Sequence, residues 1–128
     1  MFLINSNSEN LHESICLLLP TSGSTGESKF VKLTYKNIIS NIKKIAKFLT
    51  IETKDITITT LPPEYSYGLS IINSHLFKNS SIIMNKKSVI EQSFWEIIDK
   101  FKVNSFGGVP FTYELLNKIN LKSKLDSI

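Results

Sequence analysis

The organisation of this chain is clearest at residues 17–37, which read "LLLPTSGSTGESKFVKLTYKN". An apolar run leads into a loop rich in Gly, Ser and Thr, and alternating apolar and polar residues follow the loop. Gly23 and Gly26 let the backbone turn tightly and bring N–H groups close to a ligand, while hydroxyls and a lysine ammonium add further donors. The sequence therefore predicts a loop that binds polyphosphate. The predicted phosphate-binding residues are Thr21, Ser22, Gly23, Ser24, Thr25, Gly26 and Lys29.

This loop differs from a Walker A loop in its spacing. The Walker A pattern places four residues between its glycines and a lysine directly after the second glycine. Here two residues separate Gly23 from Gly26, and Lys29 lies three positions further on. On composition alone, a Ser/Gly-rich surface turn explains the stretch equally well.

The composition indicates one folded domain. A chain of 128 residues can bury a core, and an apolar fraction of 41% argues against disorder. No apolar run approaches the ~18–20 residues that cross a bilayer, so we expect no membrane span. The N-terminus lacks the pattern of a signal peptide, and Cys16, the only cysteine, can form no internal disulfide. These features predict a cytoplasmic protein.

The charge pattern does not favour a nucleic-acid partner. The net charge of +4 comes from 15 basic residues, all of them lysines and spread along the chain. Proteins that read bases and phosphates usually present a concentrated basic face. We therefore expect no nucleic acid among the partners.

Short apolar runs alternate with segments of helical periodicity beyond the loop. Strands are expected at residues 15–20, 30–33, 56–62 and 81–84, with a further strand and loop at 103–110. Helices are expected after an N-cap at Thr34, after Gly68, over residues 93–101 and around residues 113–119. The second helix is expected to turn Leu69, Ile72, Leu76 and Phe77 inward.

The alternation predicts an α/β fold with a mostly parallel β-sheet, alternating helices and right-handed crossovers. Such a sheet collects its binding loops at the carboxyl ends of its strands. The loops at residues 21–29, 62–68 and 107–111 are therefore expected to lie together.

The loop resembles the phosphate-binding signature of the adenylate-forming, or AMP-binding, superfamily, which includes acyl-CoA synthetases, luciferases and peptide-synthetase adenylation domains. That signature is roughly Y-T-S-G-[ST]-T-G-x-P-K-G, and this chain reads "PTSGSTGESKF". All seven predicted phosphate-binding residues match it in order and without a gap. The chain departs from it at Pro20, Ser28 and Phe30, where the family usually has Tyr, Pro and Gly.

The resemblance continues into two later segments, "LPPEYSYGLSIINSHLFKNSSII" and "VNSFGGVPFTYELL". In the first, Tyr65 stands where many members have His beside the acyl and adenylate site, while Tyr67 and Gly68 match; ordinary packing of the two tyrosines is the alternative. The second resembles a segment with Val-Pro before a helix that lines the acyl pocket. The resemblance thus implies a pocket that contains Tyr65, Tyr67, Gly68, Gly108, Val109 and Pro110.

The resemblance implies reaction of ATP with a carboxylic acid, giving an acyl-adenylate and pyrophosphate, before a thiol or an amine takes the acyl group. Loop donors that position and stabilise phosphate charge suit this chemistry. The implied cofactors are ATP and Mg²⁺, with Thr21 helping to place the metal. No residue is assigned a catalytic role.

The chain does not contain the family's Tyr-Gly-x-Thr-Glu segment, its ribose-binding Asp or its C-terminal lid. We therefore expect a polar leader at residues 1–14 and a partial AMP-binding domain at 15–128, one subdomain of the enzyme fold and inactive alone. A complementing chain or self-association is expected to cover it. The alternative is a non-catalytic module that binds a nucleotide or another anion.

Overall fold

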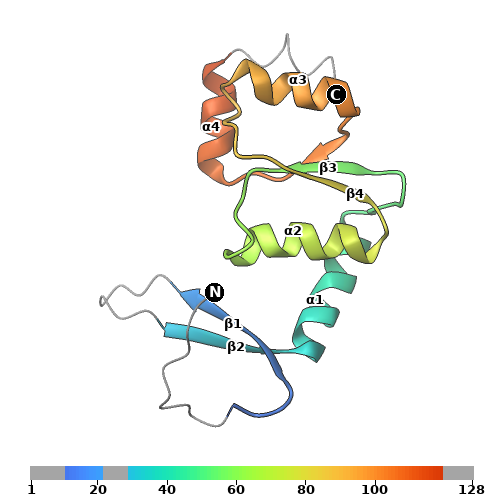
Figure 1. Cartoon of the computed structure of the whole chain (residues 1–128), viewed down its shortest axis with the longest axis vertical. Coiled ribbons are helices and arrows are strands. Elements are labelled where there is room, and N and C mark those ends of the chain that lie inside the picture. The colour runs from blue at the N-terminus through green and yellow to red at the C-terminus, as the bar shows by residue number, and fades with distance from the viewer. Residues whose placement is uncertain (1–10, 22–28, 120–128) are drawn as a thin grey trace. The chain divides into compact units, whose positions relative to one another are not determined.

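The computed structural model describes residues 11–21 and 29–119 (Figure 1). The chain divides into two compact units, Met1–Ser40 and Asn41–Ile128. The five strands of the described residues are β1 (Ile15–Thr21), β2 (Lys29–Thr34), β3 (Ile56–Thr59), β4 (Ser81–Met84) and β5 (Ser105–Phe106). The four helices are α1 (Tyr35–Phe48), α2 (Ser66–Phe77), α3 (Gln92–Phe101) and α4 (Pro110–Lys118).

The first unit contains an antiparallel hairpin made of β1 and β2. The register runs from Ile15 opposite Thr34 to Thr21 opposite Lys29, with an irregularity between Ile15 and Leu17. Pro20 is tolerated because a strand at the edge of a sheet need not donate every N–H group. The expected strands at residues 15–20 and 30–33 are therefore present, but they pair with each other and form their own sheet.

The first helix begins at the predicted cap. The Thr34 hydroxyl accepts a hydrogen bond from the Asn37 backbone N–H at 3.2 Å, and the Asn37 side-chain oxygen accepts one from the Thr34 backbone N–H at 3.0 Å. This reciprocal pair satisfies N–H groups that the first helical turn leaves without partners. Thr34 as N-cap is thus confirmed.

The second unit contains the parallel sheet, with strand order β4-β3-β5. Ile56 to Thr59 pair with Ser81 to Met84, while Thr57 and Ile58 pair with Ser105 and Phe106. Figure 1 shows α3 and α4 on one side of this sheet and α2 on the other. The expected α/β fold is confirmed here, and the mostly parallel sheet is confined to β3, β4 and β5.

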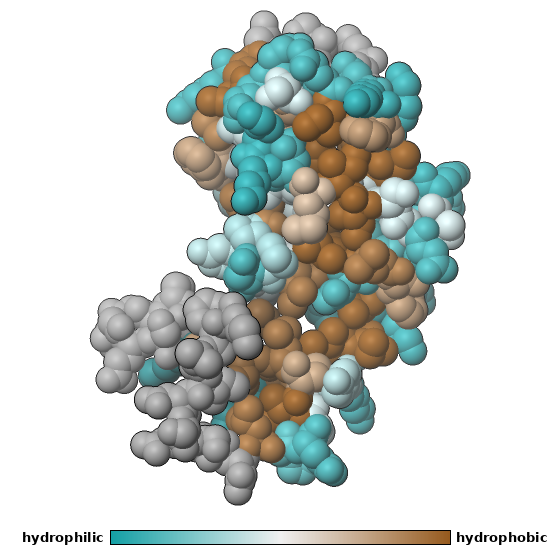
Figure 2. Space-filling view, in the orientation of Figure 1, coloured by the Kyte–Doolittle hydropathy of each residue, from teal (hydrophilic) through white to brown (hydrophobic). Residues whose placement is uncertain are grey.

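The prediction for the buried face of α2 was partly wrong. The helix begins at Ser66, before Gly68, and its buried residues are Gly68, Ile71, Ser74 and His75. Leu76 and Phe77, expected inside, are exposed. Because apolar residues occur all round α2, periodicity alone could not select its inner face. Exposed apolar side chains form brown areas of the surface in the space-filling view (Figure 2).

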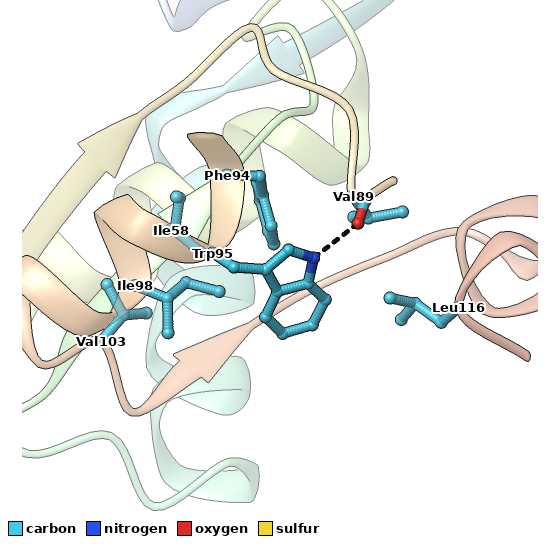
Figure 3. Close-up of a cluster of buried hydrophobic side chains, with 7 residues drawn as sticks. All are labelled: Ile58, Val89, Phe94, Trp95, Ile98, Val103 and Leu116. Atoms are coloured by element: carbon cyan, nitrogen blue, oxygen red, sulfur yellow. Dashed lines mark hydrogen bonds between the residues drawn. The ribbon is translucent and has the colours of Figure 1, made fainter. Parts of the chain in front are cut away.

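The hydrophobic core of the second unit lies between the sheet and α3 (Figure 3). Its buried members are Ile58, Val89, Phe94, Trp95, Ile98, Val103 and Leu116. Phe94 is fully buried and meets Trp95 and Phe106 edge to face, with centroid distances of 5.4 and 6.3 Å. The Trp95 indole Nε1 donates a hydrogen bond of 2.8 Å to the Val89 carbonyl oxygen, so its polar atom is satisfied inside the core.

Candidate functional site

The hairpin determines how the predicted phosphate-binding loop is closed. Thr21 ends β1, Lys29 begins β2, and the two residues lie opposite each other in the register. Directly opposed residues of an antiparallel pair have Cα atoms about 4.5–5.5 Å apart. The two ends of the loop are therefore held together at its base. The predicted residues Ser22, Gly23, Ser24, Thr25 and Gly26 lie outside the described residues, and so does the expected meeting of this loop with the other two.

Gly68 has no room for a side chain. A Cβ atom at this position would lie 2.9 Å from the Leu61 carbonyl oxygen and would overlap the Pro62 carbonyl oxygen. Both obstacles are backbone atoms of the segment that follows β3, so neither can rotate away. Glycine thus lets the first turn of α2 pack directly on this segment.

The two predicted tyrosines occupy different positions at the start of α2. Tyr65 is the N-cap residue and its side chain is 67% exposed. Tyr67 lines a cavity, and its hydroxyl would lie 2.9 Å from a Cβ atom placed on Gly107. Tyr67 is 43% exposed, and its partial burial, with a smaller effect of Tyr113, raises the pKa of its hydroxyl. The hydroxyl therefore stays protonated and can donate a hydrogen bond at neutral pH.

The cavity has a volume of about 710 Å³ and lies within the second unit. This volume is within the range of small-molecule sites. The cavity is lined by Ile45, Phe48, Leu49, Thr50, Ile51, Asp55, Thr57, Tyr67, Ser70, Ile71, Ser74, His75, Asn104, Ser105, Phe106, Gly107 and Tyr113. Of the predicted pocket residues, only Tyr67 is among them.

The other three predicted pocket residues form the approach to α4. Val109 is the N-cap, Pro110 is at the start of the helix, and a Cβ atom on Gly108 would lie 2.9 Å from the Thr112 Cβ. Proline is well suited to a first helical turn because its missing N–H would have no helical partner there. These residues set the start of α4, while the neighbouring Gly107 lines the cavity.

Hydroxyl groups and an imidazole form one wall of the cavity. Ser74 Oγ donates to the Ser70 carbonyl oxygen at 2.7 Å, and Thr57 Oγ1 donates to the Ser105 carbonyl oxygen at 3.1 Å. His75 Nδ1 lies 2.8 Å from the Ile71 carbonyl oxygen. Because a carbonyl oxygen can only accept, Nδ1 carries a proton and donates this hydrogen bond.

Sequence reasoning missed this polar wall, although part of it was visible. Tyr67, Ser70, Ile71 and Ser74 recur at spacings of three and four, which places them on one face of a helix. Ser105 gives no such signal, because only the pairing of β5 with β3 brings it beside Thr57.

Asp55 carries the negative charge at one end of the cavity. Its carboxylate accepts hydrogen bonds from the Glu52 backbone N–H at 2.7 Å and from the Asn104 side-chain N–H at 3.0 Å. The Glu52 bond is the main cause that lowers the pKa of Asp55; burial opposes the shift, and the Asn104 bond adds to it. Asp55 is therefore ionised at neutral pH.

The described part of the chain contains neither a metal-ligand cluster nor a membrane helix. Within residues 11–21 and 29–119, no three His, Cys, Asp or Glu side chains gather in a group that could hold a metal ion. In the same residues, no helix is both long enough and apolar enough to span a bilayer.

Comparison with known proteins identifies the family. The family model of the AMP-binding enzymes matches residues 5–127, so the chain belongs to this family, as its loop predicted. A 4-coumarate–CoA ligase-like protein of Arabidopsis thaliana is 27% identical over 103 residues, which are 77% of this chain and 18% of that protein.

Two solved structures share this fold. ATP-bound MatB from Rhodopseudomonas palustris matches with a TM-score of 0.67 and 29% identity, over 77% of this chain and 19% of MatB. The o-succinylbenzoate–CoA synthetase of Bacillus subtilis, solved with ATP and magnesium, matches with a TM-score of 0.68 and 24% identity, over 78% of this chain and 21% of that chain. The present chain therefore spans about a fifth of the length of these relatives.

Proposed function

We propose that this chain supplies the phosphate-binding loop and part of the acyl pocket for ATP-dependent activation of a carboxylic acid. The observation that carries the proposal is the hairpin register, because it holds Thr21 and Lys29 together at the base of a loop whose seven signature residues match the family. The ATP-bound relative MatB supports ATP as the nucleotide.

In the proposed reaction, a carboxylate oxygen attacks the α-phosphorus of ATP. The bond from that phosphorus to the oxygen bridging to the β-phosphate breaks, and pyrophosphate leaves with the electron pair. Negative charge is then concentrated on the β- and γ-phosphates, where loop N–H groups, hydroxyls and the Lys29 ammonium would stabilise it. Positioning is the main contribution of such a loop, so it needs no nucleophile of its own.

The absence of a carboxylate cluster from the described residues is compatible with Mg²⁺ as a partner of the nucleotide. Mg²⁺ commonly keeps several waters and binds substrate phosphates with few protein ligands. When bound, the ion would neutralise triphosphate charge, and we propose the Thr21 hydroxyl as a contact for it. The Bacillus relative solved with ATP and magnesium has the same fold.

We propose that the cavity beside Tyr67 receives the body of the carboxylic acid. Tyr67 lines it directly, Gly68 fixes the helical turn that carries Tyr67, and Gly108, Val109 and Pro110 set the start of α4. Tyr65, exposed at the N-cap of the same helix, would contact the acyl-adenylate from outside the cavity. We further propose that the 128 residues alone do not complete the reaction, because they span about a fifth of their relatives.

Calorimetric titration with pyrophosphate tests the loop. Lys29→Ala removes one charge-assisted hydrogen bond worth about 1.5–3 kcal/mol, so affinity should fall roughly tenfold or more. Lys43→Ala, at an exposed position of α1 outside the signature sequence, removes the same charge and should change affinity little. Equal losses in the two variants would indicate general attraction to a basic protein. Unchanged affinity in Lys29→Ala would contradict the proposed role of Lys29.

A further inference from the structure

The residues that line the cavity differ between its two ends, which lie at opposite edges of the parallel sheet. Parallel strands β3 and β5 both end near the start of α2, because that helix follows β3 and leads back to the beginning of β4. Tyr67 and Gly107 thus mark the end of the cavity at the carboxyl edge of the sheet, while Asp55 and Asn104 mark the other end. The α2 segment from Tyr67 to His75 covers about 12 Å at 1.5 Å per residue.

Ser105 is one of the residues that line this cavity, and its side chain carries an unused hydrogen-bonding group. Its Oγ is buried and, among the described residues, has no hydrogen-bond partner. A buried polar atom without a partner costs stability, whereas a hydroxyl can both donate to and accept from a ligand. The neighbouring Thr57 cannot serve it as donor without giving up its bond to the Ser105 carbonyl oxygen.

The end opposite Tyr67 favours a group that donates hydrogen bonds. Asp55 is a carboxylate, and its oxygens can only accept hydrogen bonds. A plain methyl terminus would desolvate this carboxylate without a compensating bond. A second carboxylate would be repelled by Asp55.

We propose that this cavity selects a medium-length carboxylic acid that carries a hydroxyl on the half remote from its carboxyl group. The carboxyl would lie at the Tyr67 and Gly107 end, and the remote hydroxyl would bond to Ser105 and to the Asp55 carboxylate beyond it. This specificity rests on the proposed function, since it assigns the cavity to the acid that the nucleotide activates.

Three acids of equal length test this assignment by calorimetry on the 128-residue chain: 8-hydroxyoctanoate, octanoate and octanedioate. The hydroxy acid should bind tightest and the diacid weakest. Ser105→Ala should weaken 8-hydroxyoctanoate binding about fivefold, the typical worth of one hydrogen bond, and leave octanoate unchanged. Ser93→Ala on α3, away from the cavity lining, is the matched control and should bind all three acids like the wild type.

Thermal unfolding separates a binding role from a structural one. Ser105→Ala removes an unsatisfied buried hydroxyl, so the unfolding temperature should stay the same or rise even as affinity for the hydroxy acid falls. Should the variant fail to fold, the ranking of the three acids with the wild type still decides the question.

Equal affinities for octanoate and 8-hydroxyoctanoate, or an unchanged preference in a folded Ser105→Ala variant, would overturn the proposed specificity. Binding of pyrophosphate that depends on Lys29, with no binding of any acid, would overturn it while leaving the phosphate-binding function in place. Absence of pyrophosphate binding would instead count against the proposed function itself.

Discussion

Replacing Gly68 by alanine tests whether the first turn of α2 must touch the segment that follows β3. The added methyl group would lie 2.9 Å from the Leu61 carbonyl oxygen and would overlap the Pro62 carbonyl oxygen. Carbon–oxygen contacts of the weakly attractive kind begin near 3.3 Å. Because both oxygens belong to the backbone, the helix or the segment has to move.

The net cost follows from two opposing terms. Overpacking of a filled site typically costs about 1–3 kcal/mol. Alanine recovers up to about 1 kcal/mol, because glycine is the poorer residue inside a helix. At the midpoints of these two terms, the free energy of unfolding falls by about 1.5 kcal/mol. For a domain of this size, that corresponds to a decrease of roughly 3–10 °C in the unfolding temperature.

Circular dichroism during heating measures this change, and Asn73→Ala on the same helix is the control. Asn73 is only half-buried and alanine is the better helix former, so this variant should be as stable as the wild type or slightly more stable. A Gly68→Ala protein that unfolds at or above the wild-type temperature would refute the close approach. Loss of stability in both variants would indicate a general sensitivity of α2.

Three further predictions concern self-association of the chain, its ability to catalyse the reaction alone, and the acid sensitivity of Asp55. The isolated protein should self-associate or bind a hydrophobic dye, because Phe48, Leu76 and Met84 are 86%, 58% and 61% exposed; a monodisperse, dye-free monomer in sedimentation would contradict this. It should not exchange labelled pyrophosphate into ATP with short, long or aromatic acids, whereas acid-dependent exchange that Lys29→Ala abolishes would show that the 128 residues suffice. The folded-state pKa of Asp55 lies below its ordinary value of 3.8, so the carboxylate stabilises the fold above about pH 4, and this contribution is lost as the pH falls through the folded pKa. Asp55→Asn should remove that part of the acid dependence in urea titrations at pH 2–7, and an unchanged profile would argue against it.

Local patterns predicted the elements whose burial depends on near neighbours in sequence. The run at Ser81–Met84 became β4 with the expected bounds, and Phe94 and Ile98 of α3 are buried as their spacing indicated. In α3 the apolar residues recur at helical spacing, so the assignment of a helix buries them together. The β4 run is short and bounded by polar residues, which favours a strand. The cap at Thr34 was predictable for the same reason, since its partner Asn37 lies three residues away.

Pairing partners and burial against polar surfaces were not predictable in this way. The spacing of β1 and β2 around the loop showed that they flank it, but the same spacing is compatible with strands that pair elsewhere. The prediction of the inner face of α2 was wrong because two polar residues, Ser74 and His75, are buried on this helix, whereas the apolar Leu76 is exposed. A pattern of apolar residues cannot report a face where hydroxyls are buried.

The sheet itself explains why the candidate site lies beside α2. Alternation along β3 and β5 sends Ile58 into the apolar core, while Thr57 and Ser105 face the cavity. If both faces served only stability, apolar side chains opposite α2 would avoid the cost of burying hydroxyls, one of which has no partner in the described structure. Thr57 has a partner in the Ser105 carbonyl oxygen, and the proposed ligand would supply one for the Ser105 hydroxyl. Replacing Ser105 by valine puts apolar atoms in place of the hydroxyl and separates stability from binding. The Ser105→Val variant should have a higher unfolding temperature and a lower affinity for 8-hydroxyoctanoate. A serine with a purely structural role, or a surface that binds no ligand, would not produce this combination.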